Sequence, residues 1–143
     1  MFSHIMVGTN DPDAAVRFYD AVLGRLGLRR DPEDEPDSPA GRIWYRPGRR
    51  WPQFAVRPPF DGRPASIGNG VQVSFAAPSE QAVRDCWETA LACGGSDEGA
   101  PGLRPHYNAD FFSAYCRDPD GNKLCFVHAG LHEKGYPGAA TNV

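Results

Sequence analysis

Cysteine is the residue type in this sequence whose position most directly raises a question of chemistry. The stretch "RDPDGNKLCFVH" (117–128) puts Cys125 on a short apolar run directly after a tight "DPDG" turn. A thiol at that point could be a zinc ligand, a nucleophile or a small buried hydrophobic side chain. The 4 cysteines show no C-x-x-C spacing. We therefore predict free thiols and interpret Cys125 as a residue that fills space.

The charge balance argues against nucleic acid as a partner. The chain has 15 Lys and Arg against 18 Asp and Glu, a net charge of −3, whereas binding to phosphates needs a basic face. Four arginines form one local cluster, which we interpret as an exposed strand edge or loop, with an anion site as the alternative: Arg42, Arg46, Arg49 and Arg50. No apolar run is long enough to span a membrane, and the first residues turn polar too soon for a signal peptide. We expect a cytoplasmic protein without membrane contact.

Two segments of the chain share one layout. "HIMVGTNDPDAAVRFYDAVL" starts at His4, and "VQVSFAAPSEQAVRDCWETAL" starts at Val71. Each opens with an apolar strand, passes a polar turn containing proline, and enters a helix with apolar residues three and four apart. Asp11 and Ser79 are the expected N-caps, and Pro12 suits the first helical position. Three short extended runs follow each helix, so the chain repeats with a period of about 70 residues.

This repeat predicts the fold class. One strand-helix-strand-strand-strand unit would leave one face of its sheet exposed. We therefore predict an α+β protein in which two βαβββ modules form a curved mixed sheet around a central cup, with the helices on the outside. The predicted domain spans residues 1–129. It comprises modules 2–57 and 70–129 and the linker 58–69, and a surface tail follows at 130–143.

The repeat, together with His4 in its first strand and "YCRDPDGNKLCF" near its end, resembles the vicinal oxygen chelate superfamily. This superfamily includes glyoxalase I, bleomycin-resistance proteins, fosfomycin-resistance transferases and extradiol dioxygenases. The most specific piece is the "RDPDGN" turn followed by an apolar strand. The stretch "GAPGLRPHY" is also similar to a segment common in glyoxalase-like members. The resemblance covers about residues 2 to 129, but function varies widely on such a scaffold.

The resemblance implies four cup positions at which metal-using members hold a divalent ion, usually with His, Glu, His or Gln, and Glu. Carried over to this sequence, these positions are His4, Gln53, Gln72 and Cys125. No carboxylate remains among them, and two are neutral amides, which are weak donors. We therefore predict no bound cofactor. The alternative is one divalent metal, zinc or nickel, with His4 and Cys125 as its strong ligands.

Other residues are predicted to contact a small molecule. Strand alternation from His4 and Gln72 turns Met6 and Ser74 toward the cup, and aromatic side chains could form its walls. The segment "PGLRPHYNADFF" (101–112) should lie over the mouth of the cup, where loops often carry recognition. The full set is Met6, Ser74, Trp44, Arg104, His106, Tyr107 and Tyr115.

Three functions follow as hypotheses. We favour a glyoxalase-like protein that binds a small planar or amphipathic molecule at a degraded metal site, with catalysis left open. The first alternative is a metal-dependent lyase or isomerase related to lactoylglutathione lyase, in which a metal polarises a carbonyl. A Cys125–His4 nucleophile pair is conceivable, although no third, orienting group can be named. The second alternative is a dimeric interaction module without a small ligand. The resemblance also implies a homodimer.

Overall fold

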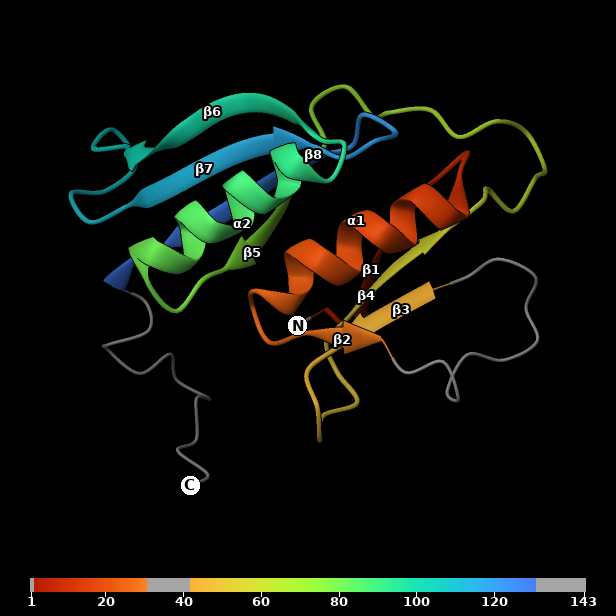
Figure 1. Cartoon of the computed structure of the whole chain (residues 1–143), viewed down its shortest axis with the longest axis horizontal. Helices are drawn as coiled ribbons and strands as arrows, with labels where there is room; N and C mark the ends of the chain where they lie inside the picture. The colour runs from red at the N-terminus through yellow and green to blue at the C-terminus, as the bar shows by residue number, and fades with distance from the viewer. Residues whose placement is uncertain (1, 31–41, 131–143) are drawn as a thin grey trace.

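The chain folds into two halves of the same type, each a four-stranded sheet with one helix (Figure 1). The computed structural model describes residues 2–30 and 42–130. The first half comprises β1 (His4–Gly8), α1 (Pro12–Gly24), β2 (Arg29–Arg30), β3 (Arg42–Tyr45) and β4 (Gln53–Arg57). The second half comprises β5 (Val73–Ala76), α2 (Glu80–Ala92), β6 (Ser96–Leu103), β7 (Phe112–Arg117) and β8 (Lys123–His128). The predicted α+β class and the two βαβββ modules are confirmed.

The helices begin where the capping residues predict. The Asp11 carboxylate accepts a hydrogen bond from the Ala14 N–H at 3.0 Å, and Pro12 takes the first helical position. The Ser79 hydroxyl accepts the equivalent bond from the Ala82 N–H at 3.1 Å. Each bond satisfies one of the backbone donors that a helix start leaves free. The same local chemistry therefore starts both helices.

The strands form two sheets of identical topology, with orders β1-β4-β3-β2 and β5-β8-β7-β6. In each sheet the strand before the helix pairs in parallel with the last strand of its half, and the other neighbours are antiparallel. The predicted curved sheet is thus divided by hydrogen bonding into two four-stranded sheets, which do not close. Both helices lie on the same side of the strands in Figure 1. Within the described residues, no helix covers the opposite sheet faces, here called the cup face.

Both halves contribute to one hydrophobic core on the helix side of the sheets. Phe54 of β4 meets Phe75 of β5 edge to face, with ring centroids 5.2 Å apart. The Cys86 thiol of α2 points at the carbonyl of Val22 in α1, with sulfur and oxygen 3.8 Å apart. Aromatic pairs of this geometry add to the gain from burial. The two helices therefore pack against one another as well as against their own sheets.

The "DPDG" turn joins the two halves. The buried Asp118 carboxylate accepts a hydrogen bond from the Tyr19 hydroxyl of α1 at 2.6 Å. Asp120 accepts bonds from the Thr9 hydroxyl at 2.6 Å and the Asn10 N–H at 2.7 Å. The Asn122 amide donates to the carbonyl of Gly8 at 3.0 Å. A motif that the sequence marked only as a turn is therefore a polar contact between the modules.

Strand β6 forms in a sequence of poor strand formers. It runs through Ser96–Leu103, although "SDEGAPGL" contains two glycines and a proline. Its pairing with β7 is irregular near Gly99, which is why the period-two pattern fails there. Val71 lies outside β5 and is exposed. The tail prediction falls beyond Gly130, outside the described residues. No helix in the described part is long and apolar enough to cross a membrane.

Alkaline pH is expected to destabilise this core. Burial raises the pKa of the Cys86 and Cys116 thiols from 9.0 to about 12. Burial, with Asp118 beside it, raises the pKa of Tyr19 well above 10.0. Above pH 9 the unfolded chain loses thiol protons that the folded chain keeps, so stability falls as pH rises. The slope approaches about 1.4 kcal/mol per pH unit for each thiol, and Tyr19 adds to it above pH 10.

Urea denaturation at a series of pH values checks this slope. The free energy of unfolding should fall from pH 9 upward in the wild-type chain. It should fall less steeply in a Cys86→Ala/Cys116→Ala variant, whose stability at pH 7 serves as its own reference. Equal slopes in the two proteins would show that these thiols ionise as readily in the folded state as in the unfolded state.

Candidate functional site

A row of polar side chains crosses the cup face of the second half. Ser74 of β5 is opposite Cys125 of β8, and Cys125 is opposite Tyr115 of β7. Side chains directly opposite one another on adjacent strands lie on the same face of a sheet. The Ser113 hydroxyl donates to the Tyr115 hydroxyl at 3.3 Å, and the Gln72 amide donates to the Ser74 hydroxyl at 3.0 Å. These residues therefore share one face of the sheet, and their role in a ligand site stays a prediction.

The Cys125 side chain is covered, with 1% of its surface exposed. Burial raises the pKa of its thiol, and hydrogen bonds with the Ser74 and Tyr115 hydroxyls only partly oppose this rise. A thiol must lose its proton to act as a nucleophile or to bind a metal. The protonated form is therefore favoured at neutral pH, in keeping with the interpretation of Cys125 as a filler.

Two cations approach the Tyr115 ring. The Arg104 guanidinium lies 5.6 Å from the ring centroid and the Lys123 ammonium 5.5 Å from it. Arg104 is held in position by a hydrogen bond from its Nη2 to the carbonyl of Ala100 at 2.7 Å. Lys123 has no hydrogen-bond acceptor within residues 2–30 and 42–130. Sequence reasoning missed Lys123, although alternation back from Cys125 puts it on the cup face.

The cup face of the first half carries a different set of side chains. His4 of β1 is opposite Gln53 of β4, and Met6 is opposite Ala55. Met6 is 54% exposed. The His4 ring shares a hydrogen bond with the Ser3 hydroxyl at 3.0 Å. Arg57, on the same face of β4 as Ala55, has a buried Nε for which the described residues supply no partner.

Strand register corrects one predicted equivalence. The backbone bonds Thr9 N–H to Arg57 O and Ala77 N–H to Val127 O occupy the same place in the two halves. They equate Arg57 with Val127 and hence Ala55, not Gln53, with Cys125. The "RPGRRWP" turn before β4 is longer than the "DPDG" turn before β8, so the equivalent of Cys125 lies farther from the turn glycine in the first half. Gln53 still neighbours His4, but it occupies a different row.

Trp44 is not on the cup face. Its side chain is 0% exposed, packs beside Tyr19 and Phe54, and donates from Nε1 to the Asp20 carboxylate at 2.8 Å. The alternation of β3 turns Trp44 toward the helix and its neighbours Ile43 and Tyr45 toward the cup. The predicted substrate contact of Trp44 is therefore wrong, because the aromatic run "WY" was read without its register.

The hairpin between β6 and β7 brings only one of its three predicted contact residues against the Tyr115 ring. Arg104 reaches that ring, as described above. His106 and Tyr107 stack on one another, with ring centroids 4.2 Å apart, and Tyr107 also meets Phe111. Tyr107 is exposed. A role for His106 and Tyr107 in ligand binding stays a prediction.

The donor groups on this face do not match the carboxylate-rich metal set that the resemblance implies. With the register corrected, the four positions carry the imidazole of His4, the methyl group of Ala55, the amide of Gln72 and the protonated thiol of Cys125. Amides are weak ligands and a methyl group is none. Within the described parts of the chain, no three His, Cys, Asp or Glu side chains gather as a metal site would require.

Two βαβββ halves with open sheet faces opposite their helices define the class of protein built on the vicinal oxygen chelate scaffold. The chain belongs to the glyoxalase/bleomycin resistance protein/dioxygenase superfamily, whose model matches residues 1–126. The predicted family is thus confirmed. Membership establishes the scaffold and leaves the reaction and ligand to the residues of the cup.

Solved structures agree with this assignment. A glyoxalase/bleomycin resistance protein from Albidiferax ferrireducens T118 is 37% identical, with a TM-score of 0.77 over 90% of this chain and 98% of that one. A glyoxalase/bleomycin resistance protein/dioxygenase family enzyme from Burkholderia phytofirmans PsJN is 18% identical, with a TM-score of 0.67 over 89% and 97%. A lactoylglutathione lyase from Agrobacterium tumefaciens is 20% identical, with a TM-score of 0.64 over 95% and 97%. The last two show likeness of fold alone. No curated protein matches the chain.

Proposed function

We propose that this protein binds a small anionic molecule with a planar body in its cup, without a resident metal. The observation that carries the proposal is the pair of cations, Arg104 and Lys123, beside the Tyr115 ring. The Lys123 ammonium has three donors and, in the described residues, no hydrogen-bond acceptor for them. A carboxylate between these two cations would gain charge-assisted hydrogen bonds, and its planar body would lie along Ser74 and Cys125.

The same donor set argues against a metal-dependent lyase or isomerase. Such an enzyme needs a base in the cup to move a proton beside the polarised carbonyl. His4 is the one described side chain at the family positions that could serve as such a base, and it lies in the other half from Cys125. A homodimer is proposed as well, because Met6 and its neighbours leave the first cup face open to a second copy.

Aromatic carboxylates test the cup. We expect benzoate or naphthoate to raise the melting temperature of the wild-type protein, and the uncharged benzamide and naphthamide to have a weaker effect. Lys123→Gln should weaken carboxylate binding roughly tenfold, because it removes one charge-assisted hydrogen bond. Arg63→Gln, in the exposed loop before β5, is the matched control and should bind as the wild type does. Equal affinity of the Lys123 and Arg63 variants would contradict the proposal.

A metal analysis distinguishes the metal-dependent enzyme from the proposed metal-free binding protein. The protein is dialysed against zinc or nickel and then against metal-free buffer, and the remaining metal is measured. Retention of about one ion per chain that is lost in His4→Ala would favour the metal-dependent alternative over the proposed function.

A further inference from the structure

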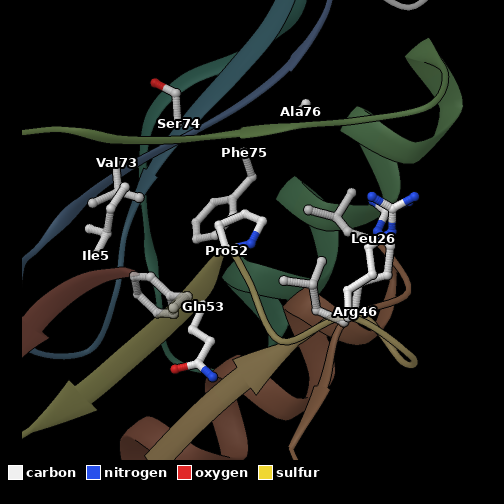
Figure 2. Close-up of a pocket in the computed structure, with 12 residues that line it drawn as sticks. Ile5, Leu26, Arg46, Pro52, Gln53, Val73, Ser74, Phe75 and Ala76 are labelled. Carbon is white, nitrogen blue, oxygen red and sulfur yellow. The ribbon is translucent and has the colours of Figure 1, made fainter. Parts of the chain in front are cut away.

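A second, apolar cleft lies between the two halves, on the helix side of the sheets. Its volume is about 490 Å³, within the range of small-molecule pockets. Eight apolar residues line it: Ile5, Leu26, Leu28, Pro52, Phe54, Val73, Phe75 and Ala76. Figure 2 shows Phe75, Pro52 and Leu26 directed into the cleft, whereas Ser74 and Gln53 point away from it. Gln53 and Ser74 also line the cleft, so it borders the cup, although their side chains are directed away from it.

The cleft is open because the two junctions between the halves differ in their contacts. At the other junction, the turn of the second half reaches Tyr19 and Thr9 of the first half through Asp118 and Asp120. The corresponding turn of the first half, residues 46–52, faces the end of β5 across the cleft. In the described chain, no hydrogen bond links these two walls. One junction is thus closed by polar contacts, and its counterpart stays open with apolar walls.

Two arginines stand at the edge of this cleft. Arg46 and Arg49 both line it, and Figure 2 shows Arg46 next to Leu26. Neither guanidinium has a hydrogen-bond or ion-pair partner within residues 2–30 and 42–130. A guanidinium offers five donors in a fork that matches a carboxylate. Apolar walls with unpaired cations at one end are complementary to a molecule with an apolar body and a single anionic head.

We propose that this cleft binds a hydrophobic monocarboxylate, with its carboxylate on Arg46 and Arg49 and its hydrocarbon body against Phe54 and Phe75. The side chains proposed to contact the ligand differ from those of the cup, although Gln53 and Ser74 border both sites. Burial of a hydrocarbon chain supplies the affinity, and the arginines select an acid over a neutral compound.

Decanoate and decanol, titrated separately by calorimetry, test the proposal. We expect decanoate to bind the wild-type chain at least tenfold more tightly than decanol. The double variant Arg46→Gln/Arg49→Gln should weaken decanoate binding roughly 10- to 100-fold and bring it close to decanol. Arg50→Gln is the matched control, because Arg50 belongs to the same turn but lies over the Trp51 ring, at 5.2 Å from its centroid. It should bind decanoate as the wild type does.

Further outcomes decide between the two sites. Lys123→Gln should leave decanoate binding unchanged, and Ile5→Trp should reduce it by filling the cleft. If Ile5→Trp fails to fold, the double arginine variant still decides, because both arginines can be replaced without disturbing the core. The proposal is overturned if decanol binds as well as decanoate, if the double variant binds normally, or if decanoate does not bind. It is also overturned if Lys123→Gln, rather than the arginine variant, abolishes binding, since the acid would then occupy the cup.

Discussion

Replacement of Asp118 by Ala is expected to lower the free energy of unfolding by about 3–5 kcal/mol, because it removes the centre of a buried hydrogen-bond network. The Asp118 side chain is 3% exposed. It accepts bonds from the Tyr19 hydroxyl at 2.6 Å, the Asn122 N–H at 2.8 Å, the Asn122 amide at 2.9 Å and the Asp120 N–H at 3.0 Å. Without the carboxylate, the buried Tyr19 hydroxyl loses its acceptor, and the partly buried donors of the turn lose theirs. Urea denaturation at pH 7 measures the loss.

Two further variants separate the contact between the halves from the local turn. Tyr19→Phe removes only the bond to the first half and should cost about 1–3 kcal/mol. Asp61→Ala is the matched control, because Asp61 also accepts a backbone N–H two residues on, from Arg63 at 3.0 Å, but lies exposed. We expect it to cost less than about 0.5 kcal/mol. If Asp118→Ala cost no more than Asp61→Ala, the "DPDG" turn would be only a turn.

The hydrogen-bond network around Asp118 also positions the cup residues of β8. Asn122 and Asp120 hold the start of β8 against the end of β1 and the residues that follow it. Lys123 and Cys125 both lie within β8. The contact that joins the halves therefore also fixes the strand that carries these cup residues. A loss at Asp118 is therefore expected to weaken ligand binding in the cup only through the fold. Binding measured below the unfolding transition would separate the two effects.

The sequence predicts the elements well because their signals are local. Asp11, Pro12 and Ser79 mark the helix starts, and apolar residues at helical spacing mark the buried faces. Along β4 (Gln53–Arg57), half-buried and buried residues alternate, as the period of a strand requires. Each of these features depends on residues within one turn or strand, and the same pattern appears in both halves.

The cup is harder to predict because it depends on register between strands that are far apart in the chain. A shift of one residue turns a side chain to the other face of the sheet, which is how Trp44 was misplaced. A turn of different length moved the counterpart of Cys125 from Gln53 to Ala55. The cleft beside Arg46 and Arg49 has no local signal at all, since it exists only where the two halves fail to meet. The sequence offered the anion site of this arginine cluster as an alternative and favoured an exposed edge.

Replacement of Trp44 by Ala is expected to cost about 3–5 kcal/mol of stability, the usual range for removing a large aromatic side chain from a core. Trp44 fills the space between Tyr19 and Phe54, at 5.5 Å and 6.3 Å between ring centroids. It also donates to Asp20, which Arg30 pairs at 3.2 Å from the other side. Trp44→Phe keeps most of the packing and loses that hydrogen bond, so about 1–3 kcal/mol is expected.

Trp51→Ala is the matched control, since Trp51 is the same residue type at 46% exposure on the cup side of the structure, with its ring 6.3 Å from that of His4. It should cost less than about 1 kcal/mol. Denaturation of the three variants in urea gives the comparison. A contact residue of the cup would behave in the opposite way, with ligand affinity lost and stability kept. A stable Trp44→Ala protein with reduced carboxylate affinity would therefore return Trp44 to the cup and overturn the register of β3.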